Sequence, residues 1–280
     1  MSLQPILAII GHPMDGDPSQ YVLHQAFSAG DLDWRYITLD VTPENLEDAV
    51  RGMRAMGFVG GNIANPHKEA VIALLDSVTE AAARVGSVNV FFREGDGLTG
   101  DNTEGKAVVA AISEKADLQG KEVVLVGGGR VGRAVAHELA GLPHPPRITV
   151  VDRDAARGDA LKALYLAGCD AECSVLGLEE PLELTEETAV LIQATDGGDE
   201  RPNSPIPLDL AQLSKNSLVV DVTLRPDPTW LVTRAKEHGL AVVDGLSLLV
   251  SQESVNYRLW TGQEPNRDAM REAAEEFLEY

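Results

Sequence analysis

The feature that most constrains this chain is a glycine-rich turn between an apolar segment and a helical one. Residues 127–132 read Gly-Gly-Gly-Arg-Val-Gly, which matches the spacing G-x-G-x-x-G, with "KEVVLV" before and "RAVAHELAG" after. In this pattern the first glycine permits a tight turn, the second lets a pyrophosphate approach the backbone, and the third lets strand and helix pack closely. The turn therefore predicts a strand–helix unit that binds a dinucleotide at the N-terminus of the helix.

The residues around the turn bear on the choice of cofactor. Asp152 ends the next predicted strand, about twenty residues on, where an acid hydrogen-bonds ribose hydroxyls. Its charge would repel a 2′-phosphate, which slightly favours NAD, whereas Arg130 and Arg153 could bind that phosphate and favour NADP. NAD and NADP both stay open. The expected cofactor contacts here are Gly127, Gly128, Gly129, Arg130, Val131, Gly132, Asp152 and Arg153.

Apolar patterning divides the chain into two α/β halves. In the first half the expected strands are "ILAII", "WRYITLDV", "VGGNIA" and "SVNVFF", and the expected helices include "YVLHQAF" and "PENLEDAVRGMRAMG". "GDGLTGDN" is expected to be a turn-rich connector, because glycine and aspartate are depleted in strands. The alternation predicts right-handed βαβ units and a largely parallel sheet.

The second half begins near Gly120 and has continuous apolar runs, which suit strands covered on both faces. These runs are "KEVVLV", "RITVVD", "AVLIQAT", "LVVDVTL" and "LAVVDG", and after Gly245 only helix is predicted. We therefore expect an α/β protein of two domains. Residues 1–103 with 246–280 would form an α/β substrate and catalytic domain, to which the C-terminal helices return. Residues 104–245 would form a doubly wound, Rossmann-type dinucleotide-binding domain.

A lysine stands where a helix should favour an acid. Asn65 is a good N-cap and Pro66 suits the first helical position, so a helix is expected to continue through "KEAVIALL". Lys68 would then lie at the positive end of the helix dipole, which lowers a lysine pKa towards the range that a general acid or base needs. The alternative is a solvated lysine partly neutralised by Glu69.

Charge and cysteine content exclude several classes of function. The formal charge of −21 makes binding to nucleic acid or to an anionic membrane surface improbable. Cys169 and Cys173 have no His/Cys pair near them, which gives no support to a zinc site or a disulfide framework. Without a secretory leader or a bilayer-spanning run, a cytoplasmic location is expected. We expect a small-molecule substrate, no metal, and a monomer or homodimer.

Several motifs together give a resemblance to the shikimate/quinate dehydrogenase family. The motifs follow one another from "GHP" at Gly11 to "LWTG" at Leu259. The family's N-V-T-x-P-x-K, G-A-V-N-T and D-N-T-D-G correspond to residues 62–68, 86–90 and 101–105, and "DGLSLLVSQE" also matches. The resemblance implies reversible hydride transfer between a nicotinamide and a ring hydroxyl of shikimate, quinate or a related hydroxy acid. It also implies that Lys68 and Glu104 handle the proton.

The resemblance further implies substrate contacts from Ser19, Asn65, Asn89, Asn102 and Gln252, and cofactor contacts from Thr195 and Gly245. The substrate pocket departs from the family pattern. Of the serine pair after the first strand only Ser19 remains, with Asp15 and Asp17 close by, while the threonine beside the lysine is Ala64 and the tyrosine is Leu224. Either the substrate differs from shikimate, or new donors such as His12, Asn65 or Arg225 replace the lost ones. A catalytically weak binding module is the alternative function, and folate-linked or amino-acid dehydrogenase chemistry is a third.

Overall fold

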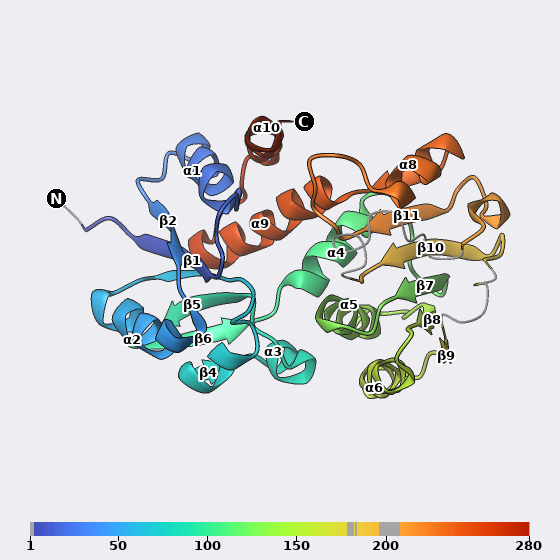
Figure 1. Cartoon of the computed structure of the whole chain (residues 1–280), viewed down its shortest axis with the longest axis horizontal. Coiled ribbons are helices and arrows are strands. Elements are labelled where there is room, and N and C mark those ends of the chain that lie inside the picture. Colours follow the sequence, from blue (N-terminus) through green and yellow to red (C-terminus); the bar gives the residue numbers. More distant parts are fainter. Residues whose placement is uncertain (1–2, 178–181, 183, 196–207, 280) are drawn as a thin grey trace. The chain divides into compact units, whose positions relative to one another are not determined.

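The computed structural model describes residues 3–177, 182, 184–195 and 208–279. The chain divides into two compact units (Figure 1). The first unit comprises Met1–Thr103 and Gln252–Tyr280, and the second comprises Glu104–Ser251. The later boundary falls inside one continuous helix, α9 (Gly245–Thr261), rather than at its start, where the sequence predicted it.

The first unit is built on a mixed six-stranded sheet. Its strands lie in the order β2 (Arg35–Asp40), β1 (Ile6–Gly11), β3 (Gly60–Ile63), β5 (Val90–Glu94), β6 (Gly97–Asp101) and β4 (Ser77–Val78). β2, β1 and β3 are parallel, as is the pair β4 and β6, but β5 is antiparallel to both β3 and β6. The predicted parallel sheet is therefore only partly correct, because a β5–β6 hairpin was not foreseen.

The segment predicted to be a connector contains β6. Two of its three glycines misled the prediction, since Gly97 and Gly100 serve close packing, and only Gly95 (φ +61°) lies in the turn before the strand. A Cβ on Gly100 would come within 2.6 Å of Leu75 Cδ1, and one on Gly97 within 3.2 Å of Asp76 Cβ. Glycine in a strand interior often marks such a close approach.

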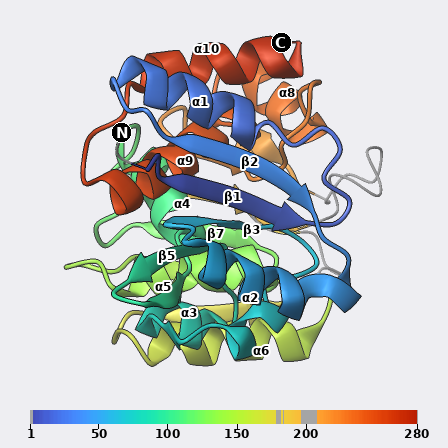
Figure 2. The same cartoon turned by 90° about the vertical axis from the view of Figure 1, so that its left-hand side faces the viewer.

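Helices cover both faces of this sheet. Figure 2 shows α1 (Ser19–Ala29) and α10 (Arg267–Leu278) above the strands, and α2 (Leu46–Met56) and α3 (Glu80–Val85) below them. Ala8 and Ile10 of β1 belong to the same core cluster as Val50 and Met53 of α2. Residues alternate between the faces of a strand, so the neighbouring buried residues of β1 face the other helical layer. The continuous apolar run in this strand follows from that double cover.

The α-helix predicted from Pro66 onward is wrong. Residues 65–69 form turns, and a short 3₁₀ helix spans Ala70–Leu74. The backbone hydrogen bonds explain the difference. The carbonyl of Lys68 accepts from Val88 N–H (2.8 Å), which lies outside this segment, and Ile72 N–H bonds Glu69 three residues back. A helix dipole at Lys68 therefore has no basis in the structure.

The second unit has a fully parallel six-stranded sheet. The order is β12 (Ala241–Val243), β11 (Leu218–Asp221), β10 (Thr188–Gln193), β7 (Glu122–Val126), β8 (Arg147–Val151) and β9 (Cys173–Leu176). Read in chain order, the first strand β7 lies between β8 and β10, which is the 3-2-1-4-5-6 order of the dinucleotide-binding fold. The predicted two-domain α/β fold with a doubly wound half is confirmed. Ligands of such sheets bind at the point where the strand order reverses, beyond the ends of β7 and β10.

The sheet of the second unit is also buried on both faces. Leu125 and Val135 belong to one core cluster, and Val124 and Leu231 belong to another. Adjacent residues of β7 thus enter different cores, which explains its unbroken apolar sequence. In the described part of this unit the α-helices are α4 (Glu104–Ser113), α5 (Arg130–Ala140), α6 (Ala155–Leu166), α8 (Trp230–Glu237) and the start of α9. Short 3₁₀ helices also span Leu210–Gln212 here and Pro43–Asn45 in the first unit. No helix within the described ranges is long and apolar enough to cross a membrane.

Candidate functional site

The glycine turn in the second unit has three glycines with different constraints. Gly127 has a φ of +107°, and a Cβ there would lie 2.7 Å from Ala194 O. A Cβ on Gly132 would lie 1.9 Å from Gly127 O, so only glycine lets α5 begin this close to the turn. By contrast, a Cβ on Gly129 would meet nothing within 4 Å. Gly129 is also the N-cap of α5, so open space lies where the helix N-terminus presents its amides.

Asp152 supports the turn from the end of β8. It is buried, its Oδ2 accepts from Gly128 N–H (2.6 Å) and its Oδ1 accepts from Asp154 N–H (2.8 Å). Both carboxylate oxygens are therefore engaged by backbone amides. Arg153 follows directly and is exposed, and Arg157 on the first turn of α6 is exposed as well. Arg130 opens α5 and is half-buried.

Of the remaining predicted cofactor residues, Thr195 lies beside the turn, whereas Val131 and Gly245 are used in packing. Thr195 contacts the turn, because its Cγ2 would lie 2.8 Å from a Cβ on Gly127, and its Oγ1 accepts from Gln193 Nε2 (2.7 Å). Val131 packs against the core of the unit. Gly245 opens α9, where a Cβ would lie 2.2 Å from Thr223 O, so this glycine is required for packing. The residues after Thr195 that were expected to continue the loop lie outside the described residues.

A chain of buried polar side chains runs through the first unit. Asn89 Nδ2 donates to Thr103 Oγ1 (3.1 Å), and Thr103 Oγ1 donates to Asn256 Oδ1 (2.7 Å). Asn256 Nδ2 donates to Glu253 Oε2 (3.4 Å), and Asn62 Nδ2 donates to Glu253 Oε1 (3.0 Å). We call these five residues the polar network. Each is buried, so the hydrogen bonds between them are electrostatically strong and costly to break.

Glu253 is the one acid in the polar network and is only 1% exposed. Burial, and to a smaller extent the nearby charge of Asp17, raise the pKa of its carboxyl to about 7. Hydrogen bonds from Asn256, Asn62 and the Ser19 hydroxyl oppose that rise. The Ser19 backbone N–H donates to Asp17 Oδ1 (2.9 Å). Ser19, at the start of α1, therefore interacts with two carboxylates.

The other predicted substrate and catalytic residues are placed as follows. Lys68 is half-buried on its turn, Asn65 beside it is exposed, and Gln252 is half-buried on α9. Asn102 is buried, and its Nδ2 donates to Ser87 O (3.0 Å). Asn89 Oδ1 accepts from Thr103 N–H (2.7 Å), so most of the hydrogen-bonding capacity of the Asn89 amide is used within the fold. Glu104 opens α4 and is buried, and it belongs to the second unit.

The sequence reasoning missed four members of the polar network, namely Asn62, Thr103, Glu253 and Asn256. A signal was present, because Glu253 and Asn256 are spaced i, i+3 in a helix whose other positions are largely apolar, which places both on one face. Asp17 was noted as an obstacle to anion binding, and the structure shows what it binds.

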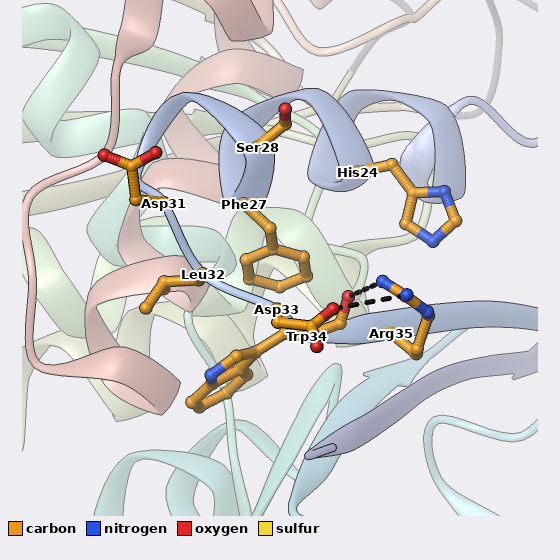
Figure 3. A pocket seen from close by; sticks show the side chains of 8 residues that line it. All are labelled: His24, Phe27, Ser28, Asp31, Leu32, Asp33, Trp34 and Arg35. Carbon is orange, nitrogen blue, oxygen red and sulfur yellow. Dashed lines mark hydrogen bonds and ion pairs between the residues drawn. The ribbon is translucent and has the colours of Figure 1, made fainter. Parts of the chain in front are cut away.

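A surface hollow of about 620 Å³ lies elsewhere on the first unit, between α1 and the start of β2 (Figure 3). His24 and Phe27 of α1 and Trp34 line it, and Arg35 forms an ion pair with Asp33 at its edge (3.2 Å). It contains none of the predicted site residues. Within the described ranges, no group of three or more His, Cys, Asp or Glu is placed to hold a metal ion.

Comparison with known proteins decides the family. Residues 9–91 match the model of the shikimate dehydrogenase substrate binding domain. A shikimate dehydrogenase (NADP(+)) of Symbiobacterium thermophilum is 36% identical over 98% of this chain and 95% of its own length. The chain belongs to the shikimate dehydrogenase family. The resemblance seen in the motifs is confirmed, and the chain is an oxidoreductase of the shikimate dehydrogenase type that acts on CH–OH donors and depends on a nicotinamide dinucleotide.

Two solved structures are similar over the whole chain. Shikimate 5-dehydrogenase from Thermus thermophilus, in complex with NADP(H) and shikimate, has a TM-score of 0.83 at 31% identity, covering 98% of this chain and 100% of that one. Ligand-free 5-ketofructose reductase of Gluconobacter has a TM-score of 0.92 at 32% identity, covering 99% of both chains. One of these two similar proteins is named for shikimate and the other for 5-ketofructose.

Proposed function

We propose that the protein reversibly oxidises a hydroxyl of a polyhydroxylated small molecule to a ketone. The first unit would bind the substrate and carry the catalytic lysine, and the second would bind the dinucleotide, as the domain assignment from sequence predicted. The observation that carries the proposal is the glycine turn, where Gly129 leaves open space before α5 while Gly127 and Gly132 cannot carry side chains. A cradle of this kind admits a pyrophosphate to backbone amides.

The bound nicotinamide would accept or supply the hydride. The amides at the start of α5 would hold the pyrophosphate, with Thr195 beside the turn. We propose NADP as the preferred cofactor, because both oxygens of Asp152 are engaged by backbone amides and Arg153 and Arg157 are exposed beside it. Guanidinium groups bind phosphate oxygens strongly, so these arginines would select the 2′-phosphate.

Proton transfer is assigned by family position to Lys68 and Glu104. The ammonium of Lys68 would donate a proton to the carbonyl oxygen during reduction and recover it from the hydroxyl during oxidation. Asn65, Asn89, Asn102 and Gln252 would orient the hydroxyls of the substrate. Asn89 keeps one N–H of its amide for that purpose, because the other donates to Thr103 Oγ1. The cytoplasmic location and the choice between monomer and homodimer stay predictions.

The test is a matrix of NAD and NADP against shikimate, quinate and 5-ketofructose, followed by the absorbance of the reduced nicotinamide. Turnover with at least one substrate, with a lower KM for NADP than for NAD, is the expected result. Replacing Arg153 by alanine should raise the KM for NADP and leave that for NAD nearly unchanged. Tight dinucleotide binding without turnover on any hydroxylated substrate would favour the binding-module alternative instead.

A further inference from the structure

The hydrogen-bond donors at the start of α1 are used by the protein's own carboxylates. The Ser19 backbone N–H donates to Asp17 Oδ1 (2.9 Å), and the Ser19 hydroxyl hydrogen-bonds the carboxylate of Glu253. A serine hydroxyl has one hydrogen to donate. With Glu253 ionised, Ser19 therefore offers a ligand only the lone pairs of its oxygen, and those accept hydrogen bonds from donors such as hydroxyl groups.

The charges around Ser19 are of one sign. The described groups that bind or act on Glu253 are Asn62, Asn256, Ser19 and Asp17, and all of them are neutral or acidic. Like charges within a few ångströms disfavour each other, and a buried site screens them weakly. A second carboxylate brought in by a substrate would thus meet two acids and no cation among these groups.

Two buried polar atoms near this cluster lack a hydrogen-bond partner within the described part of the chain. They are the hydroxyl of Tyr36, whose side chain is fully buried, and Oδ1 of Asn62, whose residue is 3% exposed. Burial, and to a smaller extent the charges of Glu253 and Asp17, raise the pKa of the Tyr36 phenol. A phenol donates and an amide oxygen accepts. A ligand hydroxyl can do both in return, whereas a carboxylate can only accept.

We propose that the polar cluster of Asp17, Ser19 and Glu253 recognises an uncharged hydroxyl-bearing group, so that the enzyme acts on a neutral polyhydroxylated ketone and discriminates against carboxylates. This inference rests on the proposed function, because it assumes that the first unit binds the substrate. Asp17 and Glu253 are then residues that determine specificity. A charged hydrogen bond lost at this position changes affinity by about ten- to a hundredfold.

A matched pair of ligands tests the inference directly. Shikimate and its methyl ester carry the same ring hydroxyls and differ only in the charge at one end. The ester is expected to be used with a kcat/KM at least about tenfold higher than that of the acid. If neither ring compound turns over, both are measured as competitive inhibitors of 5-ketofructose reduction. The ester is then expected to inhibit more strongly than the acid. Preference for the acid in either assay overturns the inference and leaves the proposed function intact.

Absence of turnover on every substrate would instead count against the proposed function. In that case calorimetric binding of the ester and the acid to the dinucleotide-loaded protein still decides the present inference. Tighter binding of the ester supports it, and equal or tighter binding of the acid refutes it.

Variants assign the effect to the two acids. Asp17→Ser, Glu253→Gln and their combination are expected to raise kcat/KM for shikimate, chiefly by lowering KM, with the double variant gaining about ten- to a hundredfold. Asp96→Asn, in the exposed turn between β5 and β6, removes one charge away from the cluster and is expected to change nothing. The single variant Asp17→Ser is expected to fold even if the Glu253 variants do not, because Asp17 is only half-buried. Folded variants with an unchanged ratio of ester to acid would contradict the inference.

Discussion

At the residue scale, the surroundings of Glu253 are unusual for a side chain of its type. Glutamate is rarely fully buried unless it is paired with a cation. Here amide groups and one hydroxyl hold it, and burial raises the pKa of its carboxyl to about 7. Such an acid is costly for the fold when it is ionised, which suggests that it is kept for recognition rather than for stability.

This raised pKa makes stability depend on pH. The unfolded chain releases the Glu253 proton near pH 4.5, but the folded chain holds it until about pH 7. The folded state therefore binds more protons in that window, so this group's contribution to stability falls as pH rises through it, by about 3 kcal/mol in total. Chemical unfolding at several pH values should show that Glu253→Gln gains stability over the wild type as pH rises. A constant difference between the two proteins would refute the raised pKa.

Some single residues were predictable and others were not. Asp152 was identified from its spacing to the glycine turn, but its hydrogen bonds to Gly128 and Asp154 were not, because spacing fixes a position along the chain and not the direction of a side chain. Glu253 was missed because a polar residue in a helix is normally solvent-facing, and only the packing of α9 against β3 shows otherwise.

At the element scale, alanine substitutions in the turn between β7 and α5 should separate an effect on fold stability from an effect on dinucleotide binding. Gly132→Ala would place a Cβ 1.9 Å from Gly127 O and should destabilise the fold, by about 1–3 kcal/mol. Gly129→Ala places its Cβ in open space and should melt like the wild type, while it weakens dinucleotide binding by obstructing the pyrophosphate. Thermal unfolding and calorimetry measure both. Undiminished dinucleotide binding by Gly129→Ala would contradict the role given to the turn.

The polar network depends on one hydroxyl, that of Thr103, which accepts from Asn89 and donates to Asn256. Thr103→Val keeps the volume but leaves a buried donor and a buried acceptor unsatisfied, so it should cost about 2–4 kcal/mol. Thr103→Ser keeps the hydroxyl and loses one methyl, at about 1 kcal/mol. Denaturant unfolding compares them, and a valine variant as stable as the serine variant would show that the network contributes little.

The elements were predictable where pattern and packing agree. Five strands of the parallel sheet in the second unit follow from continuous apolar runs, and α2 ends at Gly57 with the left-handed conformation that glycine favours. The edge strand β9 was missed, because its residues alternate between half-buried and exposed and form no continuous apolar run. The segment after Pro66 and strand β6 were mispredicted for a shared reason. In both, contacts with a neighbouring strand or loop determine the backbone, through Val88 in one case and Leu75 in the other.

At the scale of the whole molecule, the formal charge of −21 opposes compaction. Added salt shortens the range of this repulsion, from about 30 Å at 0.01 M to about 3 Å at 1 M, while exposed ion pairs contribute little. The melting temperature should therefore rise as sodium chloride is added near neutral pH. The rise should disappear near the isoelectric point of about 4.6, which serves as the control. A melting temperature that falls with salt at neutral pH would show that the ion pairs outweigh the repulsion.

The two-unit plan was predictable from the order of motifs along the chain, since the glycine turn with its strands dictates a doubly wound sheet. The mixed sheet of the first unit was not, because a hairpin rich in glycine has no clear strand signal. The proposed chemistry depends on one side chain, Lys68, whose helical setting was predicted wrongly but whose position in the family motif is unaffected by that error.

The most direct measurement of the central claim is kcat for Lys68→Met, with the dinucleotide affinity measured alongside. The account predicts that kcat falls by about a hundred- to ten-thousandfold while dinucleotide affinity stays at the wild-type value, because the variant loses proton transfer and keeps the glycine turn. Lys68→Arg should also lose most activity, since a guanidinium does not give up its proton. A Lys68→Met enzyme that turns over substrate like the wild type would contradict the account.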